Sequence, residues 1–371
     1  MLHTIICGMD AHDNTLTNQI GVDREAAETM TVRNTQEGRV KLFQHLHDLA
    51  QEHEEARILV AYEASPLGFG IYDECVGAGI ACHILAPTKM PKSLRDRKRK
   101  HDKHDAQKIF ELLKGHVLAG NALPDIWIPD HQTRDDREIV RSRLDVGRKL
   151  AAVKTQVQTL LKRNHVQRPE SVRRCWQKSH YKWLEEVELK PGARIALSSL
   201  LRQIDCLEEE IRVLDKEIEL LSQTERYRLA AEALVVQIKG VGLLTAMVFL
   251  TEIGDMRRFN NRRQIGSYLG LAPTCRESGE ESDRKGHISR EGSARMRKIL
   301  CQAAWVRTIY DAGEARVYER IVGRNPKHKK IAIVACMRRL GVLMWHLARD
   351  AQIKAGVFGN VQQQAVAHAQ T

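Results

Sequence analysis

The chain has 371 residues, and its content of 43% hydrophobic and 29% charged residues suits a folded protein of more than one domain. Its net charge of +12 favours a polyanionic partner, whereas an aromatic content of 5% does not indicate the base-stacking surfaces of single-strand binders. Eight scattered cysteines without a C-x-x-C pair argue against zinc sites and disulfide frameworks. The apolar stretch 240–251 is too short to span a bilayer, and no signal peptide is apparent, so we expect a cytoplasmic protein.

Residues 1–132 alternate short apolar runs with helical patterns. Strands are expected at 4–9, 19–22, 30–33, 57–62 and 81–86, and helices at 37–53, 67–77 and 104–116. A last short strand bracketed by prolines is expected at 123–129. This alternation predicts an α/β domain with a mixed sheet.

Four carboxylates stand at the ends of these elements. Asp10 and Glu63 each end an apolar run, and Asp102 and Asp105 open a helix three residues apart, which places them on one helix face. Converging carboxylates repel one another unless divalent cations neutralise them, and Mg²⁺ or Mn²⁺ suits oxygen ligands beside a phosphate. Each residue alone is more often a surface carboxylate or a helix cap, but together they predict a metal site for phosphodiester chemistry.

A run of cations leads into this helix. It consists of Lys89, Lys92, Arg95, Arg97, Lys98, Arg99, Lys100 and Lys103. A charge run is usually a solvated face, but this one adjoins the expected metal ligands, so we favour contact with nucleic-acid phosphates.

The region 133–230 shows two heptad patterns. Apolar residues recur in steps of three and four through 146–160 and again, more strictly, through 197–221. These patterns predict a coiled coil, whose helices could pair antiparallel with each other or with another protomer.

The region 231–356 begins with a glycine turn, Gly240-Val241-Gly242, that leads into a helix. The turn resembles a helix-hairpin-helix element, in which Lys239 and the turn amides would contact a phosphate backbone. An ordinary helix–helix turn fits equally well. The polar segment 357–371 is expected to be a disordered tail.

A polar loop later in this region contains Ser278. Basic residues surround it in sequence, and arginine forks suit the charge of a phosphate under attack by a hydroxyl. From the residues alone, Ser282, Ser289 and Ser293 compete on equal terms, and most serines in such loops are turn residues. The basic residues are Arg276, Arg284, Lys285, Arg290, Arg295 and Arg297.

At these positions the chain resembles the DEDD-type insertion-sequence transposases, a family of bridge-RNA-guided serine recombinases that is related to the Piv-type DNA invertases. The resemblance covers nearly the whole chain, and its specificity comes from the combined order of the motifs. The matching segments are Gly8-Met9-Asp10, Tyr62-Glu63-Ala64-Ser65, the D-x-x-D-A motif at 101–106, the stretch 268–273, Ser278-Gly279 and the stretch 286–292.

The resemblance implies an architecture of α/β plus α type. An RNase H-like (RuvC-like) domain at 1–132 would precede a long coiled-coil insertion at 133–230 and a mainly helical transposase domain at 231–356. It also implies that Asp10, Glu63, Asp102 and Asp105 bind metal and that Ser278 is the covalent nucleophile. The protein would act in the prokaryotic cytoplasm at the nucleoid, as a dimer or tetramer whose active sites combine domains of different protomers. A structured noncoding guide RNA would pair with donor and target DNA.

Three hypotheses follow for the activity. In the first, a transposase cuts and rejoins DNA through a phosphoserine at Ser278, with Lys98, Arg99, Lys100, Lys103, Lys239, Arg276, Arg284, Lys285, Arg290 and Arg297 binding nucleic acid. A covalent link conserves the energy of the phosphodiester bond, so strand joining needs no ATP, which agrees with the lack of a Walker-type ATP-binding motif. In the second, a RuvC-like junction resolvase uses the metals and water without the serine. In the third, the chain only binds nucleic acid.

Overall fold

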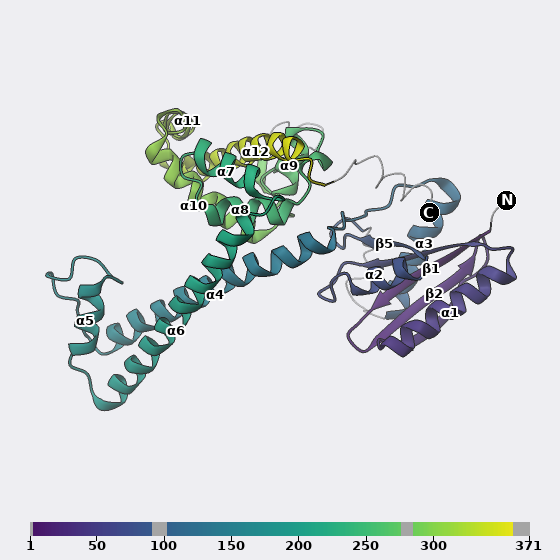
Figure 1. The fold of residues 1–371 in the computed structure, drawn as a ribbon, viewed down its shortest axis with the longest axis horizontal. Helices are drawn as coiled ribbons and strands as arrows, with labels where there is room; N and C mark the ends of the chain where they lie inside the picture. Colours follow the sequence, from purple (N-terminus) through teal and green to yellow (C-terminus); the bar gives the residue numbers. More distant parts are fainter. Residues whose placement is uncertain (1–2, 91–101, 276–284, 359–371) are drawn as a thin grey trace. The chain divides into compact units, whose positions relative to one another are not determined.

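The computed structural model describes residues 3–90, 102–275 and 285–358 (Figure 1). For residues 102, 103, 275, 285 and 286 it describes the backbone alone. The described residues fall into two compact units that meet in the sequence between Ile128 and Pro129.

The first unit is built on a mixed five-stranded sheet in the order β3-β2-β1-β4-β5. β1 pairs antiparallel with β2 and parallel with β4, while β2–β3 is antiparallel and β4–β5 is parallel. The sheet confirms the α/β prediction. The strands are β1 (Thr4–Ala11), β2 (Thr15–Val22), β3 (Glu28–Arg33), β4 (Arg57–Glu63) and β5 (Ala81–Leu85), and the helices are α1 (Gln36–Glu52), α2 (Gly70–Gly77) and α3 (Asp102–Ala119).

Alternation along the strands divides the core between the two faces of the sheet. Cys7 and Met9 of β1 face one cluster, which contains Leu42 and Leu46 of α1. The other face carries the cluster of Ile6, Leu59, Ala61, Ile109, Phe110 and Leu113, of which the last three come from α3. The sheet therefore has α1 and α2 on one face and α3 on the other.

Two expectations in this unit need correction. β2 begins at Thr15 instead of residue 19, because Asn18 is buried and its amide donates to the carbonyls of Leu16 (3.2 Å) and Met30 (3.1 Å). A buried polar side chain of this kind interrupts the apolar pattern. The strand expected at 123–129 is reduced to a single bridge between Leu85 and Asp125, since Pro124 has no amide to donate.

The second unit begins with a long helical pair. α4 (His131–Arg163) and α6 (Pro191–Ser222) run antiparallel, with α5 (Lys178–Glu186) between them in the sequence. Arg143 lies 2.6 Å from Asp215 and Lys154 lies 2.7 Å from Glu208, and these two ion pairs fix the direction of packing. In this structure the heptad helices thus pair within one chain. Their shared core contains Val153, Val157, Leu160, Leu161, Leu184, Leu197 and Ile204.

The rest of the second unit is mainly helical, as expected. Its central helix, α12, packs against α7, α10 and α11 and buries Cys336, Leu340, Met344 and Trp345. The elements are α7 (Arg228–Gln237), α8 (Leu243–Ile253), η1 (Met256–Arg258), α9 (Arg262–Tyr268), β6 (Pro273–Cys275), β7 (Lys285–Ile288), α10 (Ala294–Tyr310), α11 (Ala312–Val322), η2 (Pro326–His328) and α12 (Lys329–Ala355).

One described helix has the length and composition of a membrane span. It is the segment Pro326–Ala355, whose apolar window is 50% buried inside the protein. Arg338 and Arg339 interrupt its apolar residues, so the sequence shows no continuous apolar run there. Burial of its apolar side chains against three neighbouring helices is the usual behaviour of a core helix.

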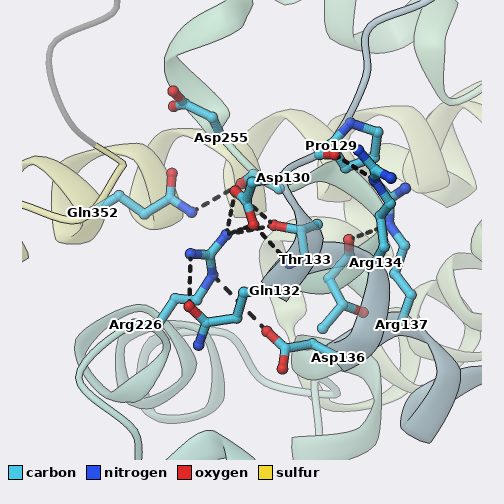
Figure 2. A network of polar contacts seen from close by, with 12 residues as sticks. Pro129, Asp130, Gln132, Thr133, Arg134, Asp136, Arg137, Arg226, Asp255 and Gln352 are labelled. Atoms are coloured by element: carbon cyan, nitrogen blue, oxygen red, sulfur yellow. Dashed lines mark hydrogen bonds and ion pairs between the residues drawn. The ribbon is translucent and has the colours of Figure 1, made fainter. Parts of the chain in front are cut away.

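A polar network joins the base of α4 to the rest of the second unit (Figure 2). Asp130 caps α4 by accepting from the Thr133 amide (2.7 Å), and the Arg226 guanidinium donates to the same carboxylate (2.7 Å). Arg137 donates to the carbonyls of Thr251 (2.7 Å) and Glu252 (2.8 Å). The first turns of α4 are therefore bonded to the α6–α7 junction and to the end of α8.

Candidate active site

The first two carboxylates lie at the ends of neighbouring parallel strands. Met9 of β1 pairs with Tyr62 of β4, so the next residues, Asp10 and Glu63, lie at the same level of the sheet. Alternation places both on the face that carries Ile6 and Ala61, which is the face covered by α3. Carboxyl ends of parallel strands are the usual place for functional side chains in α/β folds.

A glycine brings α3 directly onto this face. A Cβ added to Gly8 would lie 2.2 Å from the Phe110 nitrogen and 2.6 Å from the Ala106 oxygen, so the helix backbone touches the strand backbone. Lys114 donates to the carbonyls of Arg24 (3.0 Å) and Glu25 (2.9 Å) beyond the end of β2, next to the start of β1. α3 therefore runs antiparallel to β1, and its first turn faces the end that carries Asp10.

That first turn contains the second pair of carboxylates. α3 begins at Asp102, as the motif requires, but the Asp102 side chain lies outside the described atoms. Asp105 is described, and its Oδ1 lies 3.1 Å from Lys108 Nζ. The structure thus places all four backbone positions at one end of the sheet, two on strands and two on α3.

His12 is a neighbour of this group that the sequence did not single out. Its Nε2 lies 3.2 Å from Oδ2 of Asp10, whose side chain is 13% exposed. The β1–β2 turn brings the imidazole back over the strand end, two residues after the aspartate. His12 is therefore placed to orient the Asp10 carboxylate or to donate a proton beside it.

The donor set fits a hard divalent cation in kind. Asp10, Glu63 and Asp105 offer only carboxylate oxygens, which Mg²⁺ and Mn²⁺ prefer. Among the residues whose side chains are described, no three His, Cys, Asp or Glu side chains form a group that could hold a metal ion. Asp102 is not among those side chains, so the complete quartet stays a prediction.

The second half of the expected site is a hairpin in the other unit. β6 and β7 pair antiparallel, with Pro273 opposite Ile288 and Cys275 opposite Lys285. Thr274 Oγ1 donates to the His287 carbonyl at 2.9 Å and adds a side-chain link between the strands. The hairpin therefore brings together the two ends of the segment 276–284, which contains Ser278, Arg276 and Arg284 and lies outside the described residues.

Two glycines hold the flanks of this hairpin together. A Cβ on Gly292 would lie 2.1 Å from the Tyr268 oxygen, and one on Gly270 would lie 2.7 Å from the Gly292 nitrogen. Gly270 also has φ of +66°, which favours glycine. Arg297 donates to the Gly292 carbonyl, and burial lowers its pKa. The two parts of the C-terminal motif thus pack backbone to backbone, and part of the Arg297 guanidinium serves the fold.

The other expected contacts to nucleic acid are only partly within the described residues. Lys98, Arg99 and Lys100 lie outside them, as do the side chains of Lys103 and Lys285, while Lys239 and Arg290 are exposed. The turn after Lys239 packs on α10, since a Cβ on Gly240 would lie 3.1 Å from the Ala303 oxygen. The structure shows a tight helix–turn–helix junction there, and its contact with phosphate stays a prediction.

Two family models match the chain on either side of α6. Residues 7–166 match the IS110-type DEDD transposase model, and residues 232–319 match the model described as transposase IS116/IS110/IS902 family. Together they cover well over half of the chain. The chain belongs to the IS110/IS116 family of DEDD transposases. The first match includes all four carboxylates and the second includes the β6–β7 hairpin.

Relatives of named function agree with this family. The transposase for insertion sequence element IS1533 of Leptospira borgpetersenii is 26% identical over 348 residues, which is 91% of this chain and 95% of the relative. The protein y4qE of Sinorhizobium fredii, provisionally named a transposase, is 28% identical over 321 residues, covering 80% of this chain and 76% of the relative. A pilin gene-inverting protein of Moraxella lacunata is 30% identical over 146 residues, 38% of this chain and 44% of the relative.

The family match confirms the prediction of a transposase of insertion sequences, a class of protein that acts on DNA. It also supports an RNase H-like fold for the N-terminal domain, in agreement with the five-stranded sheet. The DEDD type of domain implies dependence on a divalent metal.

Proposed function

We propose that this transposase cuts and rejoins DNA through a covalent bond to Ser278, with a divalent metal held by Asp10, Glu63, Asp102 and Asp105. The observation that carries the proposal is the end of the sheet at β1 and β4. There, the backbone positions of Asp10 and Glu63 lie at the same level of the sheet on the face covered by α3, and the Gly8 contact brings the first turn of α3 to the same end.

The carboxylates supply negative charge in a protein that is otherwise basic. Four carboxylates at one end of the sheet would repel a DNA phosphate, so the proposal requires that cations neutralise them. When bound there, Mg²⁺ or Mn²⁺ would neutralise phosphate charge and stabilise the oxygen that leaves. His12, beside Asp10, fixes the orientation of one ligand.

Ser278 carries the covalent step. Its Oγ bonds to phosphorus as the bond from phosphorus to one sugar oxygen breaks, and the hydroxyl proton passes to that oxygen. In rejoining, a sugar hydroxyl bonds to phosphorus and the serine leaves with a proton. The number of phosphodiester bonds is unchanged, so no ATP is needed. The paired strands β6 and β7 support this role by holding both ends of the Ser278 segment.

Relatives that invert a gene favour strand exchange over hydrolysis. A pilin gene-inverting protein rearranges DNA, and inversion requires that cut ends be joined again. A junction resolvase that uses water would leave the ends to be sealed by another enzyme. We therefore place strand joining within the activity of this chain.

Guide RNA and assembly belong to the same proposal. The net charge of +12 suits a protein that holds more than one nucleic acid, and a structured RNA from the element would select donor and target DNA. A dimer or tetramer would allow the carboxylates of one protomer to meet the Ser278 segment of another.

The decisive experiment traps the covalent bond. Wild-type protein, Ser278→Ala and the control Ser282→Ala, four residues further along the sequence, are incubated with element DNA, RNA and Mg²⁺, and protein–DNA adducts are resolved on denaturing gels. We expect adducts with wild type and Ser282→Ala and none with Ser278→Ala. Cleavage without an adduct in Ser278→Ala would instead favour the resolvase. Asp10→Asn is expected to abolish cleavage, and full activity in that variant would disprove the metal site.

A further inference from the structure

A group of exposed cations lies at the turn between α11 and α12, far along the sequence from both halves of the candidate site. We call it the turn cluster, and it consists of Arg320, Arg324, Lys327, Lys329 and Lys330. All five side chains belong to exposed residues, and the whole stretch 323–331 is exposed. η2 packs against both α11 and α12, so the five residues are confined to the end of one helical hairpin.

The turn that carries these cations has a defined geometry. Gly323 ends α11 with φ of +51°, in the left-handed region that favours glycine. Asn325 Oδ1 accepts from the Lys327 amide at 3.0 Å, and the His328 amide donates to the Asn325 carbonyl at 3.0 Å. Ala332 and Ile333 are buried immediately afterwards. The cations therefore project from a turn that is fixed at both ends.

The charge of the turn cluster is not compensated within the described parts of the chain. None of its five residues forms an ion pair there, whereas Arg143 and Arg141 lie 2.6 and 2.7 Å from their carboxylate partners. The sequence contains no Asp or Glu between Glu319 and Asp350. Glu314 of α11 is already occupied, because Arg339 and Arg307 lie 3.1 and 3.6 Å from it.

This arrangement is unfavourable for the fold alone. Lys329 and Lys330 stand in the first turn of α12, where the helix dipole disfavours cations, and no acidic residue is present in that turn. Like charges gathered in one place also repel one another. Because the turn cluster does not stabilise its own helix, its presence is better explained by the binding of an external polyanion.

We propose that the turn cluster binds the phosphate backbone of duplex DNA, as a contact surface separate from the carboxylates and the Ser278 segment. The stretch 319–331 contains no Phe, Tyr or Trp, and the imidazole of His328 lies 3.2 Å from the Asn325 side-chain amide, so the chemistry is chiefly that of a backbone contact. Duplex DNA carries one charge per about 1.7 Å of its axis, which provides several phosphates within reach of one turn. This proposal rests on the proposed function only in taking DNA as the polyanion that the turn cluster binds.

The test removes charge from the cluster and measures the salt dependence of binding. Lys327→Gln, Lys329→Gln and Lys330→Gln are combined in one variant. The matched control combines Lys41→Gln, Lys149→Gln and Lys216→Gln, which remove the same charge from exposed residues scattered over three other helices. Affinity for duplex DNA of arbitrary sequence is measured without divalent metal from about 50 to 200 mM salt, the range over which phosphate contacts show their effect.

Each phosphate contact contributes about 0.9 to the slope of log affinity against log salt. We expect the slope to become shallower by up to about 2.7 in the cluster variant and to stay unchanged in the control. An unchanged slope in the cluster variant, or an equal change in the control, overturns the proposal. A loss seen with an RNA duplex but not with DNA overturns it as well, since it assigns the surface to RNA.

Two controls distinguish a lost DNA contact from misfolding and from a loss of catalysis. The melting temperature of the cluster variant is expected to equal or exceed that of wild type, because two cations leave the positive end of a helix dipole. Ser278→Ala is expected to bind DNA with the wild-type slope. Loss of adducts with an intact slope therefore counts against the nucleophile and not against the turn cluster.

Discussion

Replacement of Gly8 by alanine is expected to move α3 away from the sheet. The added Cβ would lie 2.2 Å from the Phe110 nitrogen and 2.6 Å from the Ala106 oxygen. Both are backbone atoms, so no side-chain rotation can relieve the overlap. Non-bonded heavy atoms rest about 3.5–4 Å apart, so α3 must move by roughly 1 Å or more. Overpacking of this kind costs about 1–3 kcal/mol.

The shift matters because α3 carries two of the four carboxylates. A displacement of roughly 1 Å can reduce the rate of a positioned reaction by about 100-fold. We therefore expect Gly8→Ala to form adducts about 100-fold more slowly while it still folds. Its melting temperature is expected to fall by several degrees, since each kcal/mol shifts the midpoint by roughly 2–8 °C.

Two other glycines provide graded controls in the same unit. A Cβ on Gly21 would meet the ring tip of Phe110 at 3.0 Å, and that ring can move, so a smaller effect is expected. A Cβ on Gly70 would meet nothing within 4 Å, so Gly70→Ala should behave as wild type. Thermal unfolding and single-turnover adduct formation are measured for all three variants. Wild-type rates and stability in Gly8→Ala would refute the reasoning.

Two further predictions concern stability in the second unit. Leu197 of α6 is 0% exposed in the core shared with α4, so Leu197→Ala should lower the unfolding free energy by about 2–5 kcal/mol. Ile195 is 70% exposed, so Ile195→Ala should change the unfolding free energy by less than about 0.5 kcal/mol. Equal losses for the two variants in urea titrations would contradict the pairing of the helices. Burial opposes the charged form of Asp130, yet hydrogen bonds from the Thr133 amide and Arg226 hold its pKa below the usual value. The stabilisation by Asp130 is therefore present above the unfolded pKa of about 3.9 and is lost as pH falls through the lower folded pKa. Asp130→Ala should accordingly lower the unfolding free energy at pH 7 but not at a pH below the folded pKa. A difference in unfolding free energy between wild type and Asp130→Ala that does not change with pH would contradict this.

Local pattern predicted the elements that carry the carboxylates. β1 and β4 are apolar runs that each end in a single acid, and Asp102 and Asp105 share a face of α3, so residue types and spacing sufficed. The contact of Gly8 with Ala106 and Phe110 joins residues about a hundred positions apart, and nothing near Gly8 in the sequence announces it. His12 was missed for a similar reason, because its position over Asp10 depends on the turn between β1 and β2.

The burial of charged residues in the second unit could not be predicted from the sequence pattern. Arg137 lies in a heptad-like helix, where a charged residue is expected on the solvated face. In the structure it is buried and donates to the carbonyls of Thr251 and Glu252, which lie more than a hundred residues away. Burial lowers the pKa of Arg137, and the hydrogen bonds to these carbonyl oxygens help to compensate such a cation in the interior. Periodicity therefore identified the helix but not the interface at its base.

Because of that interface, the long helices α4 and α6 pack with the unit that contains the Ser278 segment. Val140 of α4 and Ile218 and Leu221 of α6 belong to the same core as Phe249 and Trp345. The polar network of Figure 2 adds a hydrogen bond to Asp130 and hydrogen bonds from Arg137 at the start of α4, directly after the division between the units. Any contact that α4 and α6 make with DNA, RNA or another protomer thus acts on the unit that contains the Ser278 segment.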